Sequence, residues 1–130
     1  MRHTLALLGD INLMNVTDAS VPFRRVRDAL AQANCRFANL ECCLFEQKTA
    51  HELRDEGFFA SPAAGEALKL VGMDALGNAN NVNYGVEPIT ASCANLKRLG
   101  IPNTGAGADR ACAYAPVVVE RKGILSLIHI

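Results

Sequence analysis

Carboxylate and amide side chains follow three short apolar runs of this chain, and their oxygen atoms suggest metal chemistry. They are Asp10 after the run 4–8, Asn39 and Glu41 after the run 36–38, and Asn80 and Asn81 after the run 74–77. If the runs are parallel strands, their carboxyl ends meet at one rim of the sheet, where ligands bind in such folds. Oxygen ligands of this kind suit hard or borderline divalent ions such as Mg, Mn, Fe or Zn. The sequence therefore predicts an oxygen-rich metal site at this rim.

The sequence evidence for a functional role is weaker for Asp10 than for Glu41. Gly9 is expected to let the chain turn sharply, aiming Asp10 into the rim with Asn12 close by. A Gly-Asp pair is also a common turn, so a simple capping role for Asp10 stays open. Glu41 is more informative, because its sequence neighbours are apolar and an unpaired buried charge costs several kcal/mol. Its carboxylate is therefore expected to bind a cation or several hydrogen-bond donors.

Other motifs have competing interpretations. The run 78–81 also fits an asparagine-rich turn. The adjacent Cys42 and Cys43 could be soft metal ligands or a redox pair, but packing is favoured, since adjacent cysteines bridge poorly. The segment 104–107 has too few glycines for a dinucleotide fingerprint and is predicted to be a turn.

The elements that must position these residues alternate between short apolar runs and segments of helical periodicity. Helices are predicted over 21–33, 62–71 and 87–99, with Gly72 and Gly100 ending the last two. The run 4–8 has no polar face, as in a strand buried on both sides. Segment 45–57 is predicted to be a loop, and the runs 115–120 and 124–130 a hairpin. This pattern predicts an α/β fold with a parallel sheet.

Composition limits the class of protein. With 130 residues, 50% of them hydrophobic, the chain suits one domain, 1–130, with a real core. Thirteen basic and thirteen acidic residues cancel, so no nucleic-acid partner is expected. Neither a signal-peptide core nor a transmembrane run is present, which predicts a cytoplasmic chain, and five cysteines without Cys-x-x-Cys spacing predict free, mostly buried thiols. The last run ends as an uncovered apolar strand, so we expect an incomplete domain whose final residues, 125–130, need not be native.

An ordered set of motifs runs through nearly the whole chain. It comprises Gly9-Asp10, Phe37-Ala38-Asn39-Leu40-Glu41, Ala79-Asn80-Asn81 with Tyr84-Gly85, Leu99-Gly100-Ile101, Thr104-Gly105-Ala106-Gly107, and Ala113 with Pro116. This set resembles the bacterial capsule and poly-gamma-glutamate synthesis proteins called CapA, in the calcineurin-like metallophosphatase superfamily. The resemblance implies the amino-terminal portion of a four-layer α/β/β/α sandwich with a dinuclear metal site at one rim.

The resemblance also implies roles for individual residues. Asp10, Asn39, Glu41 and Asn81 match the family's metal-site motifs; Asn81 would also act in catalysis, and Asn12 and Asn80 would be further rim contacts. The implied activity is hydrolysis or transfer at a phosphoryl centre with two divalent ions (Mn, Fe, Zn or Mg). Polyglutamate, a glycan or a phosphorylated molecule would be the substrate.

The chain departs from the family pattern after Asn81. The family usually has a histidine there and an aspartate a few residues on, whereas this chain has Val82 and Asn83 in a shorter loop. His3, His51 and His129 lie too far from the predicted rim to replace the missing histidine. Two other functions therefore stay open: a catalytically silent polymer-binding or assembly subunit of the same fold, and a generic α/β binding domain.

Overall fold

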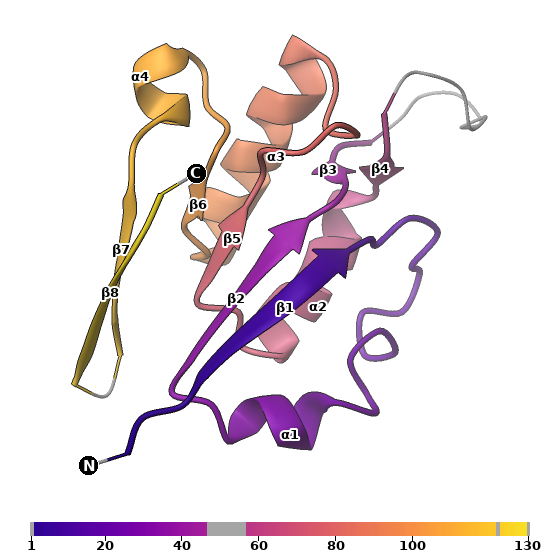
Figure 1. Ribbon diagram of the computed structural model, residues 1–130. Coiled ribbons are helices and arrows are strands. Elements are labelled where there is room, and N and C mark those ends of the chain that lie inside the picture. The colour runs from indigo at the N-terminus through magenta and orange to yellow at the C-terminus, as the bar shows by residue number, and fades with distance from the viewer. Residues whose placement is uncertain (1, 47–56, 122, 130) are drawn as a thin grey trace.

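The computed structural model describes residues 2–46, 57–121 and 123–129 (Figure 1). In chain order its elements are β1 (Leu5–Ile11), α1 (Arg27–Ala31), β2 (Cys35–Leu40), β3 (Cys43–Leu44), β4 (Phe59–Ala60), the 3-10 helix η1 (Pro62–Gly65), α2 (Glu66–Leu70), β5 (Ala75–Gly77), α3 (Val86–Leu99), β6 (Asn103–Thr104), α4 (Arg110–Ala113), β7 (Val117–Arg121) and β8 (Ile124–Ile128).

The main sheet of the described chain has the strand order β1-β2-β5-β6, and every neighbouring pair is parallel. Strands β3 and β4 form a small parallel pair, and β7 and β8 form an antiparallel hairpin. Because the four main strands run the same way, their carboxyl ends share one rim, at the arrowheads in Figure 1. The predicted α/β class with a parallel sheet is confirmed.

Helices cover one face of this sheet and the hairpin covers part of the other. On the helical face, Leu68 of α2 and Leu96 of α3 are fully buried in one cluster with Leu40 and Leu76 of the sheet. On the opposite face, Val117 and Val119 of β7 join a second cluster with Cys35, Ala75 and the partly buried Phe37. The described chain thus has three layers, in the order helices, sheet and hairpin.

A buried carboxylate connects the hairpin to the end of the sheet at which the parallel strands begin. Asp74, only 5% exposed, accepts hydrogen bonds from the backbone N–H of Arg36 (2.9 Å) and from Arg36 Nε (3.2 Å). Its other oxygen accepts from Arg121 Nε of β7 at 2.7 Å. One aspartate therefore holds β2, β5 and the hairpin together.

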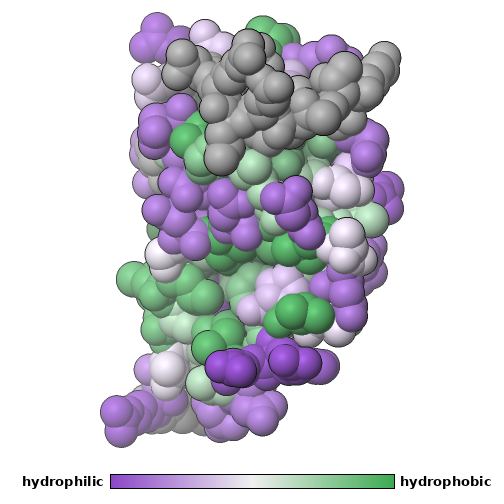
Figure 2. Space-filling view, turned by 90° about the vertical axis from the view of Figure 1, so that its right-hand side faces the viewer, coloured by the Kyte–Doolittle hydropathy of each residue, from purple (hydrophilic) through white to green (hydrophobic). Residues whose placement is uncertain are grey.

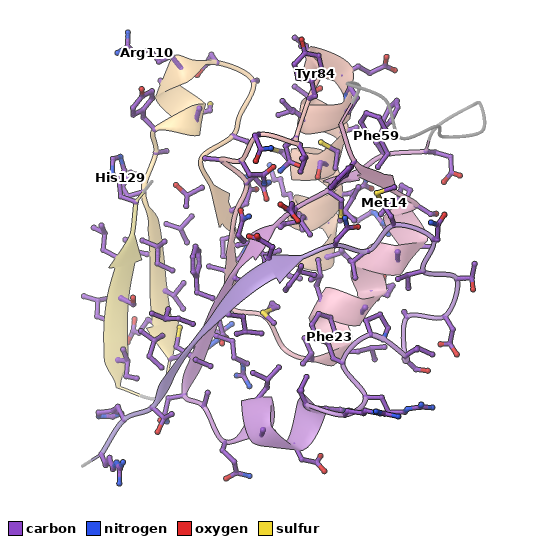
Figure 3. All side chains as sticks on the ribbon, turned by 45° about the vertical axis from the view of Figure 1, so that its right-hand side comes forward. Met14, Phe23, Phe59, Tyr84, Arg110 and His129 are labelled. Carbon is purple, nitrogen blue, oxygen red and sulfur yellow. The ribbon has the colours of Figure 1, made fainter. Side chains whose placement is uncertain are left out.

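An arginine, a tyrosine and a histidine are in successive contact between α4 and the end of β8. The Arg110 guanidinium lies 5.4 Å from the Tyr114 ring centroid, and the Tyr114 and His129 rings are 6.5 Å apart. Figure 3 shows Arg110 and His129 along the same edge of the molecule. His129, near the end of the hairpin, therefore lies against the carboxyl end of α4, in the segment that follows β6.

The first predicted helix is much shorter than expected. The periodicity predicts a helix over 21–33, but α1 spans only Arg27–Ala31 and buries none of its residues. Asp18 instead forms a local turn, in which its Oδ1 accepts hydrogen bonds from the backbone N–H and the hydroxyl of Ser20. Phe23 and Leu30 still pack against the core while partly exposed, but the chain before Arg27 forms a series of turns in place of a regular helix.

The first strand also differs from the prediction, in two respects. It is not buried on both sides: it lies at the edge of the described sheet, and Leu5 and Leu7 are 48% and 70% exposed on the side that the hairpin leaves uncovered. The strand also runs on to Ile11, so Gly9 and Asp10 belong to it and not to a sharp turn after it.

Most other element predictions are confirmed. The helical stretch 62–70 is followed two residues later by Gly72, and the helix 86–99 is followed directly by Gly100. Both glycines have positive φ (73° and 75°), as expected of the helix stop signals predicted there. The hairpin also forms, between β7 and β8. Most of the loop predicted over 45–57 lies outside the described residues.

Candidate metal-binding rim

A β-bulge in β1 decides where Asp10 points. Leu7 pairs with Phe37 of β2 and Asp10 pairs with Asn39, so β1 has one more residue than β2 over this interval. Without that extra residue, Asp10 would share a face with Leu8, which packs against the helical core. The bulge places Asp10 on the opposite face, beside Asn39.

Hydrogen bonds link three of the predicted rim residues in a row. Asn39 Nδ2 donates to Asp10 Oδ1 at 2.6 Å, and Asn80 Nδ2 lies 3.3 Å from Asn39 Oδ1. The residues come from the ends of β1 and β2 and from the loop after β5. The structure thus brings Asp10, Asn39 and Asn80 together, although they are far apart in sequence.

Asn80 and Asn83 organise the loop after β5. Asn80 Oδ1 accepts from the backbone N–H groups of Val82 (3.1 Å) and Asn83 (2.9 Å), while its Nδ2 donates to the Leu40 carbonyl at 2.8 Å. Asn83 Nδ2 donates to the same carbonyl at 2.9 Å and to the Asn78 carbonyl at 3.0 Å. The sequence had signalled an asparagine-rich loop here, but it did not single out Asn83 as an organising residue.

Glu41 follows β2 directly and is half-buried. Its backbone N–H donates to the Ile11 carbonyl at 2.8 Å, so the strand pairing continues and side-chain alternation puts Glu41 on the face of Asn39. Within the described part of the chain, neither the Glu41 carboxylate nor Asp10 Oδ2 has a hydrogen-bond or ion-pair partner. Two carboxylates with free oxygens therefore lie at adjacent strand ends.

Two of the predicted rim residues, Asn81 and Asn12, make no side-chain hydrogen bond to this group within the described part of the chain. Asn81 is exposed, and its side chain has no hydrogen-bond partner among the described residues. Asn12 is also exposed, and its Oδ1 accepts from the backbone N–H of Met14 at 2.9 Å. The metal and catalytic roles expected for Asn81 stay predictions.

Replacing Asn80 should destabilise the fold much more than replacing its neighbour. We expect Asn80→Ala to lower the free energy of unfolding by about 2 kcal/mol, because the Leu40 carbonyl and two loop N–H groups lose a partner. The matched variant Asn81→Ala should change it by less than about 0.5 kcal/mol. Urea denaturation of both variants measures this, and equal effects would contradict the assignment of Asn80 as the loop organiser.

The cysteines beside Glu41 are packing residues. All five cysteines are free; Cys35, Cys42 and Cys43 are buried, Cys93 is partly buried and Cys112 is exposed. Burial raises the pKa of the Cys42 thiol to about 11 and that of Cys43 to about 12. Both thiols are therefore protonated at neutral pH when no cation is bound, which fits the packing role that the sequence favours.

The loop after β6 closes against the loop after β5. Gly105 has φ +86°, and a Cβ added to it would lie 2.7 Å from Ala79 Cβ and 2.8 Å from Ala79 N. Thr104 Oγ1 donates to the Ala115 carbonyl at 3.0 Å. The segment 104–107 thus begins in β6, which ends at Thr104, and bends at Gly105, whereas a turn over all four residues was predicted. Asn78, which follows β5, is 4% exposed, and its Oδ1 has no hydrogen-bond partner among the residues that the structure describes.

The rim residues fit a hard divalent cation in part. The two free carboxylates are suitable oxygen ligands, and Asn39 holds Asp10 in place as an outer-shell amide does. Within the described residues there is no group of three or more His, Cys, Asp and Glu side chains that could hold a metal ion. These residues alone therefore supply only some of the ligands that a dinuclear centre needs.

Comparison with known proteins agrees with the sequence motifs. A family model described as "Bacterial capsule synthesis protein PGA_cap" matches residues 4–129. The chain belongs to this family of bacterial capsule synthesis proteins. The rim loops of this capsule synthesis protein all lie inside the matched region. A search of curated proteins gave no significant match.

The capsule synthesis protein has no helix, within its described residues, that is long and apolar enough to cross a membrane. The cytoplasmic location, the substrate and the absence of a nucleic-acid partner stay predictions.

Proposed function

We propose that this capsule synthesis protein acts through a divalent-metal site at the rim, as a hydrolase or transferase of phosphoryl-containing substrates in capsule or poly-gamma-glutamate production. The observation that carries the proposal is the β1 bulge, which places Asp10 on the face of Asn39 and Glu41. Both carboxylates keep oxygens that have no hydrogen-bond or ion-pair partner among the described residues. A bulge that moves a charged side chain next to another at a strand end is typical of functional sites.

The proposal includes the fold of the metallophosphatase superfamily. The order of helices, parallel sheet and β7–β8 hairpin supports the first three layers of an α/β/β/α sandwich. In this arrangement the hairpin would belong to the second β layer.

The chain's own residues have distinct tasks in this proposal. Asp10 and Glu41 would hold the ions, and Asn39 would orient the Asp10 carboxylate through its 2.6 Å hydrogen bond. Asn80 would fix Asn39 and the loop, leaving the exposed Asn81 side chain to contact a ligand oxygen. Divalent ions, when bound, would supply Lewis-acid polarisation of a phosphoryl oxygen.

Titration with Mn²⁺, followed by calorimetry, tests the metal site. We expect Asp10→Asn and Glu41→Gln each to abolish measurable binding, because each removes a charged ligand. Asn39→Leu should weaken binding about tenfold, since it removes only a supporting hydrogen bond. The matched control is Asp28→Asn, at an exposed carboxylate of α1, which should bind as the unsubstituted chain does. Binding that survives the Asp10 and Glu41 substitutions together would refute the site.

A catalytically silent polymer-binding or assembly subunit is the second candidate. The observation in its favour is Val82, which stands where the family usually has histidine and makes hydrogen bonds only through its backbone among the described residues: its N–H donates to Asn80 Oδ1 and its carbonyl accepts from the Phe58 N–H. Turnover of a model phosphodiester with Mn²⁺ separates the two. Turnover that disappears in Asp10→Asn supports the enzyme, whereas Mn²⁺ binding without any turnover supports the silent subunit.

A further inference from the structure

A separate pocket lies in the segment that follows β1. It has a volume of about 440 Å³ and begins at Asn12, two residues after Asp10. Ile11 and Leu13, on either side of Asn12, are buried (7% and 1% exposed) and fix this end of the segment in the core. Figure 3 shows the segment from Met14 to Phe23 descending along the outer side of the molecule beyond β1. The pocket is therefore next to the rim without sharing the Asp10 and Glu41 carboxylates.

Four polar side chains line the pocket and keep unused hydrogen-bonding groups: Asn12, Asn15, Thr17 and Asp18. Local bonds use only one oxygen of Asn12 and one of Asp18, which leaves the Asn12 NH₂ group and Asp18 Oδ2 available. The side chains of Asn15 and Thr17 have no hydrogen-bond partner among the described residues. The pocket thus offers amide donors, a hydroxyl and a carboxylate acceptor.

Apolar side chains form the rest of the lining. Val16, Val21 and Pro22 complete it, and Val21 is 51% exposed. The face of the molecule that Figure 2 shows has hydrophobic and hydrophilic side chains interleaved. A ligand with both a C–H face and several hydroxyl groups matches such a lining better than a purely apolar ligand does.

The charge of the pocket argues against an anionic occupant. None of its lining residues is basic, and Asp18 is the single charged one. Hydrogen bonds from the hydroxyl and the backbone N–H of Ser20 lower the pKa of Asp18, with a smaller contribution from the nearby Arg24 charge outside the lining, so the carboxylate is ionised at neutral pH. A phosphate or a glutamate carboxylate placed here would face like charge, whereas a sugar hydroxyl could donate to the carboxylate.

We propose that this pocket binds a neutral sugar unit of a glycan, with the ring against Val16, Val21 and Pro22 and the hydroxyls on the four polar side chains. The inference depends on the proposed function in one respect only: a polymer bound in this pocket would extend toward the proposed metal site at Asp10. It narrows the substrate class from polyglutamate, glycan or phosphorylated molecule to one that carries a neutral sugar.

Ligand-observed NMR with neutral oligosaccharides tests the proposal. Maltotetraose, cellotetraose and N-acetylchitotetraose serve as probes, and a γ-linked glutamate oligomer is the anionic comparison. We expect at least one saccharide to bind and the glutamate oligomer not to enter the pocket. Thr17→Val, which keeps the side-chain shape, should weaken saccharide binding by about threefold to tenfold.

Two further variants keep the test specific. Asn15 has φ +61°, so Asn15→Gly removes the amide at a backbone position that glycine tolerates, and should weaken binding similarly. Asp28→Asn, outside the pocket, should leave binding unchanged. Asp10→Asn should lose Mn²⁺ and still bind the saccharide. If the unsubstituted chain binds the saccharide but not Mn²⁺, the result counts against the proposed function and not against the pocket. The sugar proposal is overturned if no saccharide binds, or if binding is insensitive to both Thr17→Val and Asn15→Gly. Binding of the glutamate oligomer in place of the saccharides would also overturn it.

Discussion

Asp74→Asn is expected to lower the free energy of unfolding by about 3 to 5 kcal/mol, because it leaves a partly buried cation without its counter-charge. The Arg36 side chain is only 15% exposed and relies on the Asp74 carboxylate. The same carboxylate also anchors the hairpin through Arg121. Chemical denaturation of the variant and the unsubstituted chain measures this difference.

Arg121→Gln is the matched control for this prediction. The Arg121 side chain is 56% exposed, so the solvent replaces much of what its removal takes away. We expect a loss of at most about 1 kcal/mol. If both variants lose equally little stability, Asp74 is not the electrostatic anchor of the sheet and hairpin.

Gly105→Ala is expected to cost about 2 to 4 kcal/mol of stability, because it combines backbone strain with a collision. The φ of +86° disfavours any side chain, and the new Cβ would lie 2.7 Å from Ala79 Cβ. Ala79 belongs to the loop that also holds Asn80, so Mn²⁺ binding at the rim should weaken as well. Thermal unfolding and the Mn²⁺ titration measure the two effects.

Two other glycines separate strain from collision. Gly100 has φ +75° but nothing within 4 Å of an added Cβ, so Gly100→Ala should cost about 1 kcal/mol from strain alone. Gly9 has neither a positive φ nor a close neighbour, and Gly9→Ala should be within about 0.5 kcal/mol of neutral. A Gly105→Ala variant no less stable than Gly100→Ala would show that the two loops are not in close contact.

Local patterns were enough to predict much of the fold. The periodicity of 87–99 and the glycine after it predicted α3 and its left-handed end, because helix length and glycine conformation depend on neighbouring residues. The family motifs could be read from residue types and order in the same way, and the match over 4–129 confirms them. The length of helix α1 was overestimated, because apolar side chains such as Phe23 can reach the core from turns as well as from a helix, and periodicity does not separate the two.

The candidate site was predictable only as a set of residue types. Asp10, Asn39 and Asn80 were expected near one rim, and the structure brings them into contact. Their roles within the set could not be separated by spacing, since Asn80 and Asn81 are adjacent and differ only in which way the loop turns them. The exposure of Leu5 and Leu7 was not predicted, because an apolar run has the same sequence pattern in an edge strand as in a central strand of a sheet.

The sequence by itself determined the α/β class, the family, the helix ends at Gly72 and Gly100, and the identity of the rim side chains. Only the tertiary structure decided that Asp10 faces Asn39, because the face of a strand residue depends on its register with the partner strand, and the bulge exists only in the pairing of β1 with β2. It also decided that Asp74 joins Arg36 to Arg121, since a buried charge selects its partners by proximity in the folded chain.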